Sequence, residues 1–468
     1  MVTFSSRGAV ERVCRRWRRL CLATFPCTAA IRFDQGLRTQ SAAHCPPALE
    51  HISAALRLRH LQELELSGCY DGLPLPLPAV TALAAATFPT LRRLKLKQQL
   101  LSTLVAFLPL CCRLESLSIN HSSMLDAAKW EELVKALRTL VQLRQLDLSV
   151  FSSPCAALAA ALQQLPRLQG ISLDDYELSE APWLPHLRDL DVWLDTAQQG
   201  QLLAQAILPG LVELECTFSV PQQAWYCRHL TALTCWHCHV DSRDLLPAAD
   251  MQLDKLRRLQ LRGASDEDCF PAQLCALPLT SLLWMEEDCC DARKSLPPDF
   301  SRLSTLQQLA INGLPLSQQG LAPLASLSAL TELHLPDCPG KGDCLPRGPY
   351  LRRLLALDIS GLSSSSDALL PPAVPGATAL RALCASWCPL LSLLADWPKV
   401  KEALSKLRRL QVLSLPGMES WAGAATRQGL LSLFREHFPL KVHVAEADVL
   451  NRYPHLSSLA EDVYAWEC

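Results

Sequence analysis

Aromatic side chains and unbalanced charge are both scarce in this chain. Only 6% of its 468 residues are aromatic, so the core must be built from aliphatic side chains. Charged residues make up 19% and the formal net charge is −2. That balance lacks the general footprint of a nucleic-acid-binding protein and gives no broad attraction to an anionic membrane surface. Hydrophobic residues reach 49%, which predicts ample burial and argues against wholesale disorder.

Long uninterrupted apolar runs are missing as well. The longest candidate, residues 72–91, contains four prolines and does not suit a lipid-facing helix of ~20 residues. Arginines at positions 15, 16, 18 and 19 interrupt the place where a signal peptide would need its apolar segment. We therefore interpret the 21 cysteines as reduced thiols of a cytoplasmic protein. Nuclear and cytoskeletal or axonemal locations stay open, and a transit peptide is the alternative interpretation of the arginine-rich start.

A phrase of the form Leu-x-x-Leu-x-Leu recurs along most of the chain. Its fifteen copies begin at Leu61, Leu91, Leu114, Leu143, Leu168, Leu187, Leu211, Leu230, Leu256, Leu279, Leu306, Leu330, Leu354, Leu380 and Leu410. The mean interval is about 25 residues, within the ~20–29 residues of the leucine-rich repeat. The Leu-x-Leu part has period two, as expected of a short strand with one buried face.

These copies predict an α/β fold, a right-handed leucine-rich-repeat solenoid of about 15 repeats. Its strands would form a parallel sheet along the inside of a horseshoe, because no repeat can bury its leucines without its neighbours. Apolar residues at helical spacing predict helices on the outer side at 130–141, 158–165 and 400–407. We expect the solenoid to span 49–444, with a C-terminal cap or tail at 445–468.

The ninth position of four repeats is cysteine, and it is asparagine in none. Those cysteines are Cys69, Cys238, Cys338 and Cys388. In this respect the chain resembles the cysteine-containing, RNI-like class found in F-box leucine-rich-repeat proteins.

Residues 1–35 contain a short amphipathic segment ahead of the repeats. Val13, Cys14, Trp17 and Leu20 lie in the pattern Val-Cys-x-x-Trp-x-x-Leu, which resembles the closing third of an F-box. The opening Leu-Pro and two further helices of that module have no counterpart in the nine residues before Val10. The resemblance implies a helical, truncated F-box that contacts a Skp-type adaptor through those four side chains. The alternative is a plain helical cap over the first repeat.

One cysteine-rich string imitates a metal or haem site. It reads Cys235-Trp-His-Cys238-His, but the repeat register places both cysteines at positions that the solenoid buries. No phosphate loop, nucleophile elbow or assignable triad is present. We therefore expect a protein that is not an enzyme and that has no cofactor or metal.

The residues between the strand leucines should face the concave surface. In three adjacent repeats and the start of a fourth they are acidic or aromatic. The residues predicted to bind a partner are Asp174, Asp175, Asp189, Asp191, Trp193, Glu213, Glu215, Phe218 and Trp236. Basic residues flank them at Arg93, Lys95 and Lys97 on one side and at Arg258 and Arg262 on the other. Aromatic anchors beside acids favour a basic protein target; the alternative is a merely solvated surface.

Two functions fit these features. The first is a protein-protein interaction solenoid that serves as the substrate-recognition subunit of a Skp-cullin-F-box ubiquitin ligase, a monomer within that complex. The second is a scaffold unrelated to ubiquitin, for example a cytoskeletal or axonemal protein. In both, the partner is a protein on the concave face, with neither nucleic acid nor membrane involved.

Overall fold

A computed structural model describes the chain in segments. They are residues 27–32, 61–67, 88–97, 105–121, 127–150, 156–174, 186–192, 210–217, 227–236, 252–262, 270–285, 296–312, 320–336, 338, 340–341, 345–359, 362–363, 373–384, 402, 404–414 and 443–445. The chain divides into two compact units, Met1–Cys216 and Thr217–Cys468. Each unit is described by itself below.

The first unit is built on a ladder of parallel strands. They are β1 (Cys27–Arg32), β2 (Leu61–Ser67), β3 (Arg93–Lys97), β4 (Ser116–His121), β5 (Gln145–Val150), β6 (Gly170–Asp174), β7 (Asp189–Val192) and β8 (Glu213–Thr217). Each strand pairs with the next in sequence, from β1 through to β8. Seven of these strands, β2 to β8, lie within the first seven leucine phrases.

Register explains why the leucines recur. Leu94, Leu117 and Leu146 are direct neighbours on β3, β4 and β5, and each is at most 1% exposed. Because side chains alternate across a strand, the residues between the leucines all project to the opposite side of the sheet. We call that opposite side the inner face of the unit.

A repeated turn leads into the strands. Just before β5, the Leu143 N–H donates to the Leu140 carbonyl at 2.9 Å. The Glu115 carbonyl of the preceding repeat then accepts from both Arg144 and Gln145, at 2.8 and 3.0 Å. Equivalent pairs of bonds recur in both units, so one carbonyl per repeat uses both lone pairs to fix the next strand.

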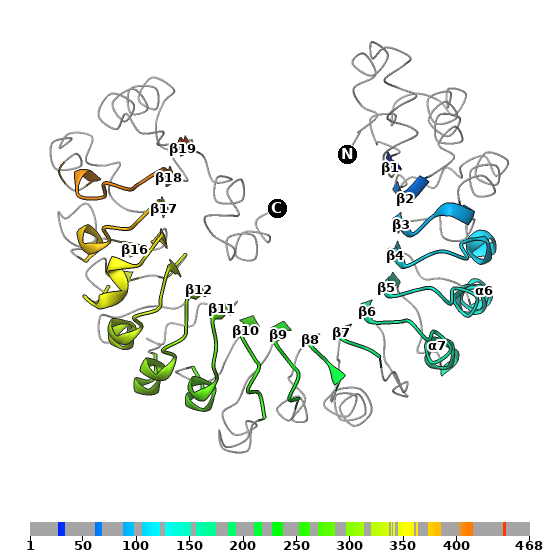
Figure 1. Cartoon of the computed structure of the whole chain (residues 1–468), viewed down its shortest axis with the longest axis horizontal. Helices are drawn as coiled ribbons and strands as arrows, with labels where there is room; N and C mark the ends of the chain where they lie inside the picture. The colour runs from blue at the N-terminus through cyan, green and yellow to red at the C-terminus, as the bar shows by residue number, and fades with distance from the viewer. Residues whose placement is uncertain are drawn as a thin grey trace, which may run out of the picture. The chain divides into compact units, whose positions relative to one another are not determined.

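The opposite side of the first sheet carries a helical layer (Figure 1). It consists of η2 (Phe88–Thr90), η4 (Val105–Leu110), α6 (Ala127–Leu137) and α7 (Ala156–Leu162). The two α-helices confirm the helices predicted at 130–141 and 158–165, but they end earlier, at Leu137 and Leu162, and Val141 is exposed. Leu133, Leu137 and Leu162 of these helices are fully buried. Their periodic apolar side packs toward the sheet, as an amphipathic helix requires.

The second unit contains a second parallel ladder. Its strands are β9 (Ala232–Trp236), β10 (Arg258–Arg262), β11 (Ser281–Met285), β12 (Gln308–Asn312), β13 (Glu332–His334), β15 (Ala356–Asp358), β17 (Ala382–Cys384), β18 (Val412–Ser414) and β19 (His443–Ala445). They pair in that order. A separate two-stranded sheet joins β14 (Gly340–Lys341) to β16 (Leu362–Ser363).

Short 3-10 helices replace α-helices opposite most strands of the second unit. They are η7 (Ala272–Ala276), η8 (Pro298–Arg302), η9 (Ala322–Ser326), η11 (Pro349–Arg352) and η12 (Val374–Gly376). Proline at the first or second position opens η8, η9, η11 and η12. Proline suits a first turn but lacks the N–H that a continuing helix needs. Of the third helix expected, at 400–407, residues 402 and 404–405 are described and are helical.

Among the described strands of the two ladders, β1 and β19 lie outside the fifteen phrases. β19 lies at residue 444, where the solenoid is expected to end. β1 lies inside the segment 1–35, for which the resemblance implies a helical module, and its residues 27–32 form a strand on the edge of β2. The remaining residues of 1–35 are outside the described part of the chain.

Candidate protein-binding face

Two rows of polar side chains cross the inner face of the first unit. The register from β2 to β8 places in one row Glu63, Arg93, Ser116, Gln145, Gly170, Asp189 and Glu213. The second row contains Glu65, Lys95, Ser118, Asp147, Ser172, Asp191 and Glu215. These rows are the third and fifth positions of successive leucine phrases.

Four predicted acids come together at the β7–β8 end of these rows. Asp189 is the direct neighbour of Glu213, and Asp191 is the direct neighbour of Glu215. Glu213 is exposed, and the other three are partly exposed. Partial burial raises the pKa of Asp189, the Glu213 carboxylate raises it further, and Arg188 opposes the shift. Ionisation of the Asp189–Glu213 pair therefore costs free energy, and a cation on a partner would lower that cost.

Sequence reasoning missed two serine–aspartate hydrogen bonds in this face. The Ser118 hydroxyl donates to Asp147 Oδ2 at 2.7 Å, and the Ser172 hydroxyl donates to Asp191 Oδ2 at 2.6 Å. Each serine lies on the strand before its aspartate, at the same position of the phrase. That shared position is the signal that would have found them. The bonds fix the direction of two carboxylates and extend the acidic row to β5.

A glycine lies beside Asp189 in the first of these rows. Gly170 lies between Gln145 and Asp189 in the same row. A β-carbon built on Gly170 would lie 3.5 Å from Gln145 Cγ and 3.6 Å from Asp189 Cβ, which is ordinary contact. Gly170 is itself buried, so the side chains of Gln145 and Asp189 close over it in this row.

The predicted basic strand β3 is partly compensated within the unit. Arg93 Nη1 lies 3.9 Å from Glu63 Oε2 on β2, and both side chains are partly exposed. The inner face thus changes from mixed charge at β2–β3 to acidic charge at β5–β8. This gradient is the electrostatic character that the described residues give to the face.

Trp236 belongs to the second unit, on β9. Its direct neighbour on β10 is Arg262, whose guanidinium carbon lies 4.0 Å from the centre of the indole ring. Trp236 was predicted to bind a partner, and Arg262 to belong to the basic flank beside it. The structure brings the two into contact with each other, and Arg262 is only 5% exposed.

Other predicted site residues lie outside the described residues. These are Asp175, Trp193 and Phe218 of the partner face, the side chain of Asp174, and the adaptor-binding set Val13, Cys14, Trp17 and Leu20. Their roles stay predictions.

The inner face of the second unit differs from that of the first. Leu283, Ala310, His334 and Asp358 occupy the fifth position of four successive phrases, and each is 0% exposed. Burial lowers the pKa of His334, and Asp358 opposes the shift. The first unit therefore carries the accessible charged rows among the described residues.

Most of the described cysteines behave as core residues, and Cys112 is exposed. Cys235 is fully buried, as its repeat register predicts. Burial raises the pKa of the Cys227 thiol to about 12, and burial with the neighbouring Cys112 raises that of Cys111 to about 12. Such thiols stay protonated and unreactive. Within the described residues, no group of three His, Cys, Asp or Glu side chains is placed to hold a metal, and no helix is long and apolar enough to span a membrane.

The repeated phrase and the parallel ladders define the fold as a leucine-rich-repeat solenoid. Similar solved structures are leucine-rich-repeat proteins. TLR13 in complex with ssRNA13 is 19% identical with a TM-score of 0.43, over 77% of this chain and 58% of that one. The chain thus spans less than two thirds of that protein.

Two further structures show the same likeness. An internalin, inlF from Listeria monocytogenes, is 18% identical with a TM-score of 0.38, over 66% of this chain and 75% of that one. The plant peptide hormone receptor RGFR1 in complex with RGF2 is 16% identical with a TM-score of 0.33, over 78% and 64% respectively. No family profile and no curated protein matches the chain in sequence.

Proposed function

We propose that the chain is a protein-binding solenoid whose first unit holds a basic segment of a partner on its inner face. The observation that carries this proposal is the pairing of Asp189 with Glu213 and of Asp191 with Glu215 on adjacent strands. Like charges directly opposite each other destabilise a sheet. Their retention on an accessible face is explained by a cationic ligand that offsets the repulsion.

The partner that fits is a segment with lysine or arginine at successive positions. Strands in a sheet lie about 4.8 Å apart, so the carboxylates from β5 to β8 cover about 15 Å. An extended segment of about five residues covers the same length. The serine-held carboxylates of Asp147 and Asp191 supply fixed acceptors, and the exposed Glu213 adds a further carboxylate. Complementary charge of this kind mainly sets specificity and association rate.

The finer assignment is a substrate-recognition subunit of a Skp-cullin-F-box ubiquitin ligase, with the chain a cytoplasmic, non-enzymatic monomer in that complex. It is supported by the F-box-like residues Val13, Cys14, Trp17 and Leu20 and by the cysteine at the ninth repeat position. Cys338, the described member of that set, is fully buried, and its Sγ lies 3.2 Å from the Ile311 carbonyl of the preceding repeat. The second candidate is a scaffold protein that uses the same face without an adaptor.

Charge reversal tests the binding face. The variant combines Asp189→Lys, Asp191→Lys and Glu213→Lys, and proteins recovered with the full chain from cell extract are compared with those of the wild type. The matched control reverses three exposed carboxylates elsewhere, Glu131, Asp254 and Asp299. We expect the first variant alone to lose basic partners. Equal recovery by both variants would remove the inner face as the binding site.

Co-purification separates the two candidates. A ubiquitin-ligase subunit must bring down a Skp-type adaptor, and Trp17→Ala with Leu20→Ala should abolish that recovery while the inner-face partner is retained. A scaffold recovers its partner whether or not the adaptor is present. Failure to recover the adaptor with the wild-type chain excludes the ligase assignment and leaves the protein-binding proposal standing.

A further inference from the structure

Five exposed arginines gather on three consecutive repeats of the second unit. They lie where the chain enters β15, β17 and β18, and they are Arg352, Arg353, Arg381, Arg408 and Arg409. We propose that this arginine cluster binds an acidic segment of a partner protein, at a site separate from the inner face of the first unit.

Backbone bonds fix the spacing of the cluster. The Leu355 carbonyl accepts from Arg381 and Ala382 at 2.8 and 3.0 Å, and the Arg381 carbonyl accepts from Gln411 and Val412 at 2.7 and 2.9 Å. The three turns therefore stack at the separation of neighbouring strands, about 4.8 Å. Five positive charges consequently share an edge about 10 Å long.

The sequence forces these side chains outward. Residues 351–354 and 407–410 both read Leu-Arg-Arg-Leu. All four leucines are buried, at 6% exposure or less, so each arginine pair must project to solvent. In the repeat between them, the corresponding residues are Thr378 and Ala379, which are small. The two arginine pairs therefore lie on either side of a repeat with small side chains at these positions, which we call the low point of the edge. Arg381 lies beside it.

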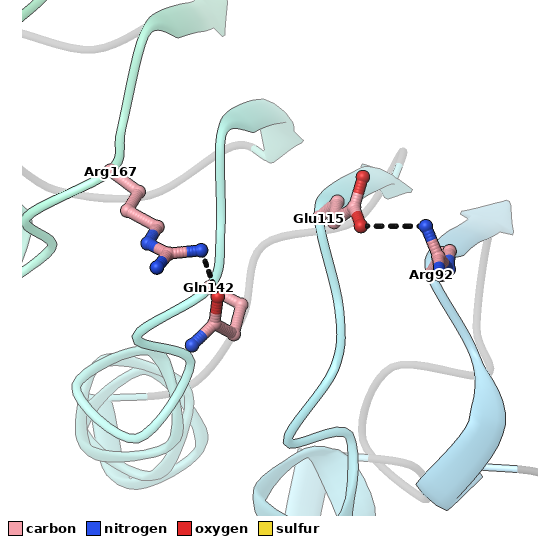
Figure 2. A network of polar contacts seen from close by, with 4 residues as sticks. All are labelled: Arg92, Glu115, Gln142 and Arg167. Carbon is pink, nitrogen blue, oxygen red and sulfur yellow. Dashed lines mark hydrogen bonds and ion pairs between the residues drawn. The ribbon is translucent and has the colours of Figure 1, made fainter.

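Internal acids do not balance this charge at the described positions. Elsewhere on the strand-entry edge, arginines meet polar groups of a neighbouring repeat. In the first unit Arg92 Nη1 lies 3.2 Å from Glu115 Oε1, and Arg167 donates to Gln142 (Figure 2). Within the described part of the cluster, Arg353 donates to the Ser328 carbonyl at 3.3 Å, and no carboxylate occupies an equivalent edge position.

A carboxylate close to the cluster in sequence is already engaged by a lysine. Glu402, in the helical turn before β18, lies 3.1 Å from Lys406 Nζ. An external anion is therefore the natural counter-charge for the cluster.

The composition of the cluster selects the kind of anion. All five residues are arginine, whose planar guanidinium matches a carboxylate with two parallel hydrogen bonds. Single-stranded nucleic acid binding relies on exposed aromatic rings for base stacking, and no described aromatic side chain is classed as exposed. A membrane site would be strengthened by apolar side chains, but the described exposed large hydrophobics, Leu110 and Val141, are in the first unit.

The dimensions fit an extended acidic peptide. Alternate side chains of an extended chain lie about 7 Å apart on one side. An edge of about 10 Å therefore meets two carboxylates of one peptide face, each within reach of an arginine pair. The low point at Thr378 and Ala379 leaves room for the peptide backbone between them.

A direct binding assay with the full chain tests the proposal. The probe is a fluorescent peptide of glutamates only, compared with a glutamine-only peptide of equal length by fluorescence anisotropy. We expect binding of the glutamate peptide alone, with affinity that falls as salt rises. Replacing Arg352, Arg353, Arg408 and Arg409 with Gln should weaken binding about tenfold or more, since each exposed charge pair contributes a factor of up to about five.

A second variant removes the same net charge elsewhere. It carries Gln at four exposed arginines outside the cluster, Arg113, Arg138, Arg144 and Arg302, and should bind the peptide nearly as well as the wild type. A variant with Lys at the four cluster arginines keeps the charge. It should bind the peptide with intermediate affinity, because lysine cannot make the two parallel hydrogen bonds of a guanidinium. Circular dichroism confirms that each variant folds.

Three outcomes overturn the proposal. One is absence of glutamate-peptide binding by the wild type. Another is equal weakening by the cluster variant and its charge-matched control. The third is tighter binding of single-stranded DNA or of phosphatidylserine vesicles than of the glutamate peptide at the same salt concentration, which would assign the cluster to nucleic acid or membrane instead.

Discussion

The guanidinium carbon of Arg262 lies 4.0 Å from the centre of the Trp236 ring, and the two residues are direct neighbours on β10 and β9. Both are the seventh residue of their repeat, counted from the first leucine of the phrase. A cation over an indole face is attracted by the ring quadrupole, more strongly where water is excluded. A partner that binds Trp236 must therefore accommodate a cation supplied by the chain itself, which disfavours a second cation on that face.

A double-mutant cycle measures this contact. Trp236→Leu, Arg262→Met and the double variant are compared by urea unfolding. Because Arg262 is 5% exposed, we expect a coupling energy of about 1–2 kcal/mol. The control pairs Trp236→Leu with Arg258→Met, an exposed arginine on the same strand, and should be additive. Additivity in both cycles would show that the ring and Arg262 contribute independently.

Gly348 lies against the backbone of the neighbouring repeat. A β-carbon at this position would lie 2.5 Å from the Ala325 carbonyl oxygen and 2.8 Å from Ala325 Cα. Backbone cannot move aside as a side chain can, so Gly348→Ala should lower the free energy of unfolding by about 1–3 kcal/mol.

Gly376→Ala is the matched control for that substitution, because its β-carbon meets only Leu351 Cδ1 at 3.6 Å. We expect it to be neutral or slightly stabilising, since alanine restricts the unfolded chain. Urea unfolding of both variants checks the pair. Similar destabilisation by the two would mean that the loss of glycine itself, rather than the contact with Ala325, causes the effect.

The leucine register made the strands predictable. Burial of one side at period two leaves only one way to pair successive phrases, and each of the fifteen phrases contains a strand. The positions of Asp189 and Glu213 in adjacent strands followed from the same rule, and so did the burial of Cys235. The contact between Trp236 and Arg262 could also have been predicted, because residues at the same position of successive repeats become neighbours in the sheet.

Other features depended on information that the phrase does not contain. Leu283 and Ala310 occupy inner-face positions, yet they are fully buried, because burial there depends on what packs over the strand rather than on its own pattern. The serine–aspartate bonds required two residues in different repeats to be considered together. The choice between an α-helix and a 3-10 helix does not follow from the phrase, since the proline that opens η8 and η11 also suits the first turn of an α-helix.

His334 should make stability depend on pH. It is fully buried and adjacent to Asp358, and burial lowers its pKa below the ordinary value of 6.5. Unfolding releases the ring to take up a proton at its ordinary pKa. The unfolded state then binds more protons than the folded state, so stability is complete above 6.5 and falls as pH drops toward the folded pKa.

Urea unfolding across this pH range tests that dependence. We expect His334→Gln to lower stability at neutral pH, through loss of packing, and to flatten the decline below pH 6.5. The control is His186→Gln, an exposed histidine of the first unit, which should leave the slope unchanged. A variant that keeps the wild-type slope at position 334 would assign the decline to other groups.

Asp189 should affect the pH dependence of the free energy of unfolding in the opposite direction to most carboxylates. Partial burial raises its pKa above the ordinary value of 3.8, and Glu213 adds to the shift. A raised folded pKa gives a stabilising contribution that is present below the ordinary value and lost as pH rises through the folded pKa. At neutral pH, Asp189→Asn should therefore raise the free energy of unfolding by a few tenths of a kcal/mol, because it removes a like-charge pair. At pH values below 3.8 the variant and the wild type should be equally stable.

Two further variants are the controls for this prediction. Glu213→Gln should reproduce the gain in stability, while Glu131→Gln on α6 should not. A basic partner should bind Asp189→Asn less tightly than the wild type, although the variant is more stable. A loss of stability at neutral pH on removing either carboxylate would contradict the view that this pair is kept for binding rather than for folding.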